Sequence, residues 1–189
     1  MARQLSSVLD APLVASTVSR LLIDLNRSLD NRYVWSDATR DLPAAIQQRI
    51  VRRHYAPYRQ QVAAIIHDAI AAGRRVLHLS SHSFTPVLDG AVRMADVGLL
   101  YDPARPGEAA FASRWKSAFA DAAPRLRVRR NYPYAGKNDG LTSTLRRRFA
   151  PDRYVGIEIE LNQAFVHSGQ LPWRQMRATV IGTLQAAMR

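Results

Sequence analysis

The sequence contains no cysteine, so disulfide bonds are excluded and any bound metal must take its ligands from histidine and carboxylate side chains. No apolar run approaches the ~18 residues that a membrane-spanning helix needs. The N-terminus, Met1-Ala2-Arg3-Gln4, does not open the basic, apolar and small-residue regions of a signal peptide. We therefore expect a cytoplasmic protein with no membrane partner.

Lysine is also scarce, since only Lys116 and Lys137 are present among 27 basic residues. The formal net charge of +12 is thus carried by arginines spread along the chain, with one dense run at 146–148. Helix-turn-helix, zinc-finger and aromatic RNA-binding motifs do not accompany this charge. It predicts a field that favours small anionic substrates, and no specific nucleic-acid partner.

The length of 189 residues and the hydrophobic share of 47% predict one folded domain over residues 1–189. Apolar spacing predicts helices over 2–9, 43–73 (kinked or divided at Pro57 and ended by Gly73), 108–122, 142–149 and 172–188. Apolar and β-branched runs predict strands over 12–17, 20–25, 75–79, part of 92–101, 126–130 and 154–161. This alternation indicates an α/β sandwich with a central mixed sheet flanked by helices.

Ligands of open α/β sheets lie beyond strand ends, which directs attention to polar residues at those points. Arg20, Asn26 and Arg27 lie on or after the first predicted strands, and arginine forks with an amide suit carboxylate binding. The alternative is that Arg27 only pairs with Asp24 or Asp30 at the surface.

His82 follows the strand predicted over 75–79, a position that suits a metal ligand or a general base. His78 lies inside that strand, where we expect a hydrogen-bonded structural histidine. A structural role is the alternative for His82 as well.

Two further segments carry polar groups. Residues 129–140 place Asn131, Tyr134 and Lys137 in a turn-rich loop after a strand, which fits either substrate binding or ordinary turns.

Glu158 and Glu160 are two apart on a predicted strand, so their side chains share one face. Two carboxylates on an apolar central strand are costly unless they are paired or functional, and a general base is one such function.

Four pieces in this order resemble the N-formylglutamate amidohydrolase family: S-R-L-L-I-D-L-N-R at 19–27, S-H-S-F-T-P at 81–86, N-Y-P-Y-A-G-K-N-D-G at 131–140 and G-I-E-I-E-L-N-Q at 156–163. The resemblance implies a hydrolase fold like that of zinc carboxypeptidases and aspartoacylases, within the phosphorylase/hydrolase-like class. It also implies a zinc-dependent enzyme that splits an N-formyl or related N-acyl amino acid into formate, or another acid, and the free amino acid.

The resemblance assigns roles to single residues. It implies that His82 is a zinc ligand and that Glu160 is the base that deprotonates water, with Glu158 as the alternative base. Arg20, Asn26 and Arg27 would clamp the substrate carboxylates. The loop residues Asn131, Tyr134 and Lys137 would line the same pocket.

One departure concerns the metal. Family members carry further metal ligands in an N-terminal histidine-containing segment, whereas this chain has no histidine before His54. His82 alone cannot hold a catalytic zinc, which takes three protein ligands and a water. We expect an N-terminally incomplete domain prone to self-association through exposed sheet or core surface. The alternative is a non-catalytic relative that binds anions or a partner.

Overall fold

The computed structural model describes residues 1–189, which divide into two compact units. The first, here the sheet unit, consists of Met1–Ala11, Leu77–Asn138 and Tyr154–Arg189. The second, here the helical unit, consists of Pro12–Val76 and Asp139–Arg153. That residues 1–189 form a single domain stays a prediction.

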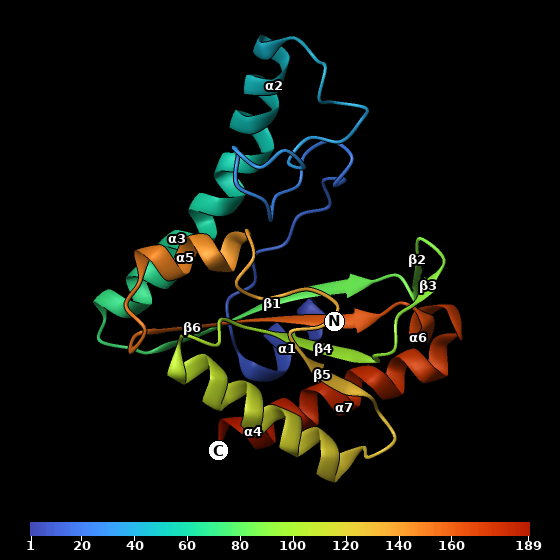
Figure 1. The fold of residues 1–189 in the computed structure, drawn as a ribbon. Helices are drawn as coiled ribbons and strands as arrows, with labels where there is room; N and C mark the ends of the chain where they lie inside the picture. The colour runs from blue at the N-terminus through green and yellow to red at the C-terminus, as the bar shows by residue number, and fades with distance from the viewer. The chain divides into compact units, whose positions relative to one another are not determined.

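The sheet unit contains a mixed four-stranded sheet (Figure 1). Its strand order is β1 (Val76–Phe84), β6 (Tyr154–Asn162), β4 (Val97–Leu100) and β5 (Val128–Arg130). Strand β4 is antiparallel to β6 and parallel to β5. The predicted α/β architecture with a central mixed sheet flanked by helices is confirmed.

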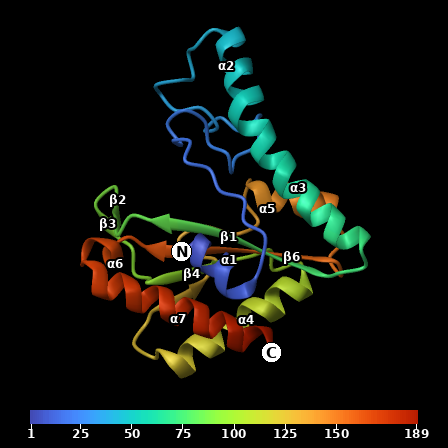
Figure 2. The ribbon, with the colours of Figure 1, turned by 180° about the vertical axis from the view of Figure 1, so that it is seen from behind.

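Helices α4 (Pro106–Ala122) and α7 (Gln170–Met188) cover one face of this sheet, as Figures 1 and 2 show from opposite sides. Phe111, Trp115 and Phe119 are buried on α4, which confirms the predicted apolar face of this helix. Trp115 also donates its indole N–H to Thr183 Oγ1 on α7, over 3.1 Å, so the one polar atom of this side chain is satisfied. The short helix α1 (Ala2–Leu9), predicted from the sequence, adds Leu5 to the same core.

Side chains along β6 alternate between the two faces of the sheet, with apolar residues on one face and acidic residues on the other. Ile157, Ile159 and Leu161 belong to the apolar core, so Glu158 and Glu160 project from the opposite face of the sheet. The connection after β1 forms a small antiparallel hairpin of β2 (Val87–Leu88) and β3 (Ala91–Val92), and helix α6 (Ala164–His167) follows β6.

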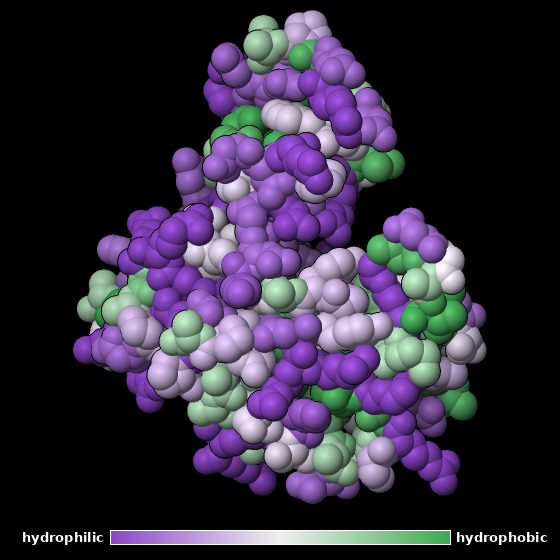
Figure 3. Space-filling model, in the orientation of Figure 1, coloured by the Kyte–Doolittle hydropathy of each residue, from purple (hydrophilic) through white to green (hydrophobic).

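The hairpin leaves apolar side chains exposed, which Figure 3 shows as hydrophobic atoms within a mostly hydrophilic surface. Val87, Leu88 and Val92 are 49%, 45% and 65% exposed. No helix of the chain is both long and apolar enough to cross a membrane.

The helical unit contains α2 (Ala44–Ile50), a π-helical turn η1 (Val51–Tyr55), α3 (Ala56–Ala71) and α5 (Leu141–Arg148). The helix changes type just before Pro57, because the π-turn ends at Tyr55 and Pro57 lies in the first turn of α3. The backbone stays helical through this change, so Pro57 does not divide the helix. Gly73 adopts φ 77° and ends the helix as expected, with Arg74 N–H donating to the Ala69 carbonyl.

The strands predicted over 12–17 and 20–25 are wrong. These residues form turns and irregular backbone, in which the Ser16 and Ser19 hydroxyls accept hydrogen bonds from N–H groups two residues later. Such local bonds compete with a sheet ladder. The apolar run instead packs Ile23 against Val34 and Tyr55 in a separate small core.

Candidate functional site

His82 lies inside β1 and not at its end, which corrects the sequence-based placement. The strand continues to Phe84, whose carbonyl accepts a hydrogen bond from Gln163 N–H over 3.0 Å after the end of β6. On the neighbouring strand, Glu158 Oε2 lies 3.9 Å from His82 Nε2. His82 and Glu158 therefore share the face of the sheet that is opposite the apolar core.

The Ser80 hydroxyl also approaches His82 Nε2, at 2.8 Å. In a serine–histidine–acid triad, the serine and the acid contact different ring nitrogens. Here Ser80 and Glu158 both approach Nε2.

His78 has the structural role that its position predicts. Its Nδ1 lies 2.8 Å from the hydroxyl oxygen of Tyr154, a fully buried side chain. This hydrogen bond joins β1 to β6 and satisfies two polar groups at once.

Glu158 and Glu160 are both buried, with 7% and 6% exposure, and they share one face as predicted. Glu160 is the register partner of Gly98 on β4. A Cβ at Gly98 would lie 2.0 Å from the Tyr132 carbonyl oxygen and 3.2 Å from Glu160 Cβ. The loop after β5 therefore passes directly over Gly98, beside Glu160, and only glycine leaves room for it.

Asn131 braces that loop. It adopts φ 50°, and its Oδ1 accepts hydrogen bonds from the N–H groups of Tyr101 and Gly136, each over 3.0 Å. Because the side-chain oxygen is occupied, substrate binding by Asn131 would use its amide N–H groups. Tyr134 is 42% exposed and Lys137 is exposed in the same loop.

The other three predicted binding residues belong to the helical unit, where acids already contact them. Arg20 Nη2 lies 2.5 Å from Asp24 Oδ2, and Arg27 Nε lies 4.0 Å from the same oxygen. The expected surface pairing of Arg27 with Asp24 is thus present. Asn26 Oδ1 accepts the N–H of Leu141 over 2.8 Å, which ties residue 26 to the start of α5.

Asp139, which the sequence indicated only as a turn residue, organises this part of the helical unit. Its carboxylate accepts hydrogen bonds from the N–H and hydroxyl of Ser28 and from Asn31 Nδ2, over 3.0, 2.7 and 2.8 Å. Burial alone would raise the pKa of Asp139, but these hydrogen bonds and the charge of Arg27 outweigh it and hold the pKa below its usual value. No sequence signal pointed to these partners, because they lie more than 100 residues away.

The donor set does not fit a catalytic zinc. No group of three or more histidine, aspartate or glutamate side chains in residues 1–189 is placed to hold a metal ion. His82 and Glu158 form a pair, whereas a catalytic zinc takes three protein ligands.

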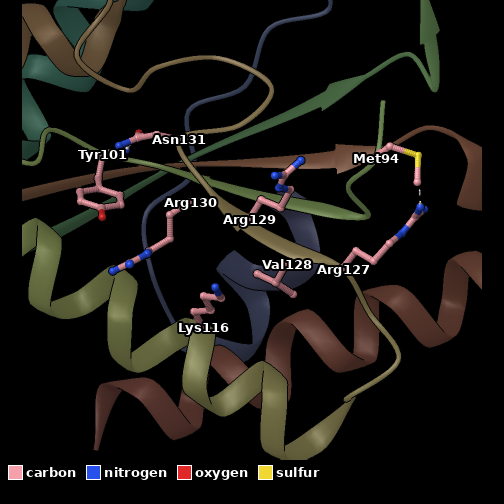
Figure 4. A pocket seen from close by; sticks show the side chains of 8 residues that line it. All are labelled: Met94, Tyr101, Lys116, Arg127, Val128, Arg129, Arg130 and Asn131. Carbon is pink, nitrogen blue, oxygen red and sulfur yellow. Dashed lines mark hydrogen bonds between the residues drawn. The ribbon is translucent and has the colours of Figure 1, made fainter. Parts of the chain in front are cut away.

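A basic cavity of about 630 Å³ lies elsewhere in the sheet unit, over β5 and α4 (Figure 4). Its lining contains none of the residues His82, Glu158 or Glu160. The cavity is lined by Met94, Tyr101, Lys116, Arg127, Val128, Arg129, Arg130 and Asn131. Asp96 pairs with Arg127 at 2.7 Å and raises the pKa of this guanidinium through a hydrogen bond and its charge.

The sequence profile of the N-formylglutamate amidohydrolase family matches residues 1–166. The chain belongs to this family. No match was found among curated proteins. Among solved structures, gene product Atu2144 from Agrobacterium tumefaciens is similar, with 30% identity and a TM-score of 0.83 over 99% of this chain and 74% of that one.

The N-formylglutamate amidohydrolase from Ralstonia eutropha JMP134 has the same fold, with a TM-score of 0.70 and 22% identity over 92% of this chain and 74% of that one. The family match over residues 1–166 confirms the resemblance that the four sequence segments carry. Membership of the N-formylglutamate amidohydrolase family makes the protein a hydrolase that acts on a linear amide.

Proposed function

We propose that this family member hydrolyses the amide bond of N-formyl-L-glutamate or a related N-acyl amino acid. The observation that carries the proposal is the pair of buried carboxylates, Glu158 and Glu160, beside His82 on the non-core face of the sheet. Buried ionisable side chains that gather at one place are characteristic of functional sites. The excess of positive charge supports an anionic substrate.

In this proposal Glu160 is the general base. Its carboxylate takes a proton from water as the water oxygen bonds to the acyl carbon, and the carbonyl π electrons move to the carbonyl oxygen. The oxyanion electrons then reform the carbonyl as the C–N bond breaks, and the proton passes from Glu160 to the departing amine. The carboxylic acid formed releases its own proton to solvent. The products are formate, or another acid, and the free amino acid.

The structure distinguishes the two glutamates by their neighbours. Glu158 faces His82 across β1 and β6, and Glu160 lies at the register position of Gly98, beside the loop after β5. We assign Glu158 the task of orienting His82 and keep it as the alternative base.

Substrate binding is proposed for two groups of residues. In the helical unit, Arg20, Asn26 and Arg27 would bind a substrate carboxylate, because guanidinium and amide N–H groups suit that ligand. In the sheet unit, Asn131, Tyr134 and Lys137 would line the proposed substrate pocket.

The test is formate release from N-formyl-L-glutamate. We expect Glu160→Gln to lower kcat by at least about a hundredfold, since a positioned base contributes 10²–10⁴-fold. Glu158→Gln should lower kcat less, and Asp121→Asn, an exposed carboxylate on α4, is the matched control and should leave kcat unchanged. Full activity of the folded Glu160→Gln variant would reject this base.

The zinc requirement stays a prediction, and no step above passes through a metal. It is checked by elemental analysis of protein purified without chelator. About one zinc per chain, lost in a His82→Ala variant, would establish His82 as a ligand whose partners lie outside the groups described. Turnover by zinc-free protein would contradict the requirement.

The incomplete donor set favours one second candidate, a non-catalytic relative that binds anions or a partner. This alternative predicts no formate release and no stoichiometric metal.

Self-association of the chain also stays a prediction. Sedimentation velocity over a range of protein concentrations tests it.

A further inference from the structure

Arg93 is a buried arginine that no sequence motif singled out. It lies between β3 and β4, is 9% exposed, and its backbone N–H donates to the Pro86 carbonyl over 2.8 Å. Its guanidinium makes no hydrogen bond or ion pair in the structure. By contrast, Arg105 and Arg127 of the same unit face Glu108 and Asp96, at 3.4 and 2.7 Å.

Two aromatic rings hold the guanidinium in place of an acid. Its central carbon lies 5.1 Å from the ring centroid of Tyr134 and 5.8 Å from that of Phe84. Cation–π contacts offset part of the cost of burying the charge, but they leave the N–H groups without acceptors. The guanidinium nitrogens are not among the fully enclosed atoms that lack a hydrogen-bond partner, so the guanidinium keeps some exposure to solvent.

The position of Arg93 relates it to the proposed site. Phe84 ends β1, two residues after His82. Tyr134 belongs to the loop that passes over Gly98, the register partner of Glu160. Both rings that hold Arg93 thus come from segments that shape the face with His82 and Glu160.

We propose that Arg93 binds the side-chain carboxylate of an acidic N-acyl amino acid and so determines specificity for dicarboxylate substrates. The inference rests on the proposed function. A planar fork of N–H donors without an acid partner matches a carboxylate in geometry and charge. Within the sheet unit, Arg105 and Arg127 face Glu108 and Asp96, whereas aromatic rings flank Arg93, which leaves it suited to a substrate carboxylate.

The experiment measures equilibrium binding by calorimetry, in a Glu160→Gln background that prevents turnover. N-formyl-L-glutamate and N-formyl-L-glutamine serve as probes, because they share the α-carboxylate and differ only in the charge of the side chain. We expect Arg93→Gln to raise the Kd for N-formyl-L-glutamate by at least about tenfold, as for a lost charge-assisted hydrogen bond, and the Kd for N-formyl-L-glutamine by less than about threefold. Arg93→Lys should restore part of the difference.

The matched control is Arg129→Gln, an exposed arginine whose guanidinium carbon lies 4.6 Å from the Tyr132 ring centroid. It should change neither Kd. Equal weakening of both probes by Arg93→Gln, with the fold intact by circular dichroism, would show that Arg93 only packs the loop and would overturn the inference. Absence of N-formyl-L-glutamate binding would overturn it too, whereas binding without turnover in the parent chain would reject only the proposed hydrolysis.

Discussion

At the scale of single residues, Asp139 shows how one carboxylate can organise distant segments. It holds Ser28 and Asn31 through three hydrogen bonds, and Arg27 donates to its backbone carbonyl over 2.7 Å. Its pKa lies below the usual value, so its ionised form stabilises the folded helical unit. This contribution is present above the unfolded-state pKa and is lost as the pH falls through the folded-state pKa.

Replacement of Asp139 by asparagine should therefore cost stability at neutral pH and little in acid. We expect a loss of about 1–2 kcal/mol in the free energy of unfolding at neutral pH, allowing for solvent screening of a partly exposed group. The loss should shrink at about pH 3, below the ordinary aspartate pKa. Urea titrations at both pH values measure it, and an equal loss at both would contradict the role of the charge.

At the scale of elements, the fit of the loop after β5 against β4 depends on glycine. The Tyr132 carbonyl occupies the space where a Gly98 side chain would lie, and a Cβ at Gly136 would lie 2.1 Å from Tyr101 N. The backbone φ of Gly98 is not in the left-handed region, so sterics alone require glycine there. The same contact sets the distance between this loop and Glu160.

Gly98→Ala should accordingly displace the loop. We expect a loss of about 1–3 kcal/mol in unfolding free energy, as for overpacked sites, together with a fall in formate release. Gly182→Ala on α7 is the control, because nothing lies within 4 Å of its added Cβ, and it should stabilise the helix by about 0.5–1 kcal/mol. A stable, fully active Gly98→Ala variant would show that the loop adapts without cost.

At the scale of the whole molecule, the net charge of +12 acts on any anionic ligand. Long-range attraction raises the rate of encounter and is screened by salt. We expect kcat/KM for N-formyl-L-glutamate to fall several-fold between about 20 and 300 mM salt, as the Debye length shortens. The dianion should respond more steeply than the monoanion N-formyl-L-glutamine, and identical responses would mean that the charge does not steer the substrate.

Much of the architecture was predictable from local pattern. Period-two alternation placed Glu158 and Glu160 on one face, and helical spacing identified the buried face of α4. Gly73 ends its helix with a positive φ, and Pro57 lies in the first turn of α3, where proline is tolerated. The order of the four strands was not predictable, because pairing joins residues far apart in sequence.

The sequence by itself determined the family, the mixed α/β class and the side of the strand from which the two glutamates project. Only the tertiary structure decided that residues 12–25 form no strand, that His82 lies within β1, that Asn131 braces its own loop and that Arg93 is buried without an acid. The physical reason is the range of the interactions. Side-chain direction follows from local backbone geometry, whereas the partner of a polar group depends on which distant segments pack beside it.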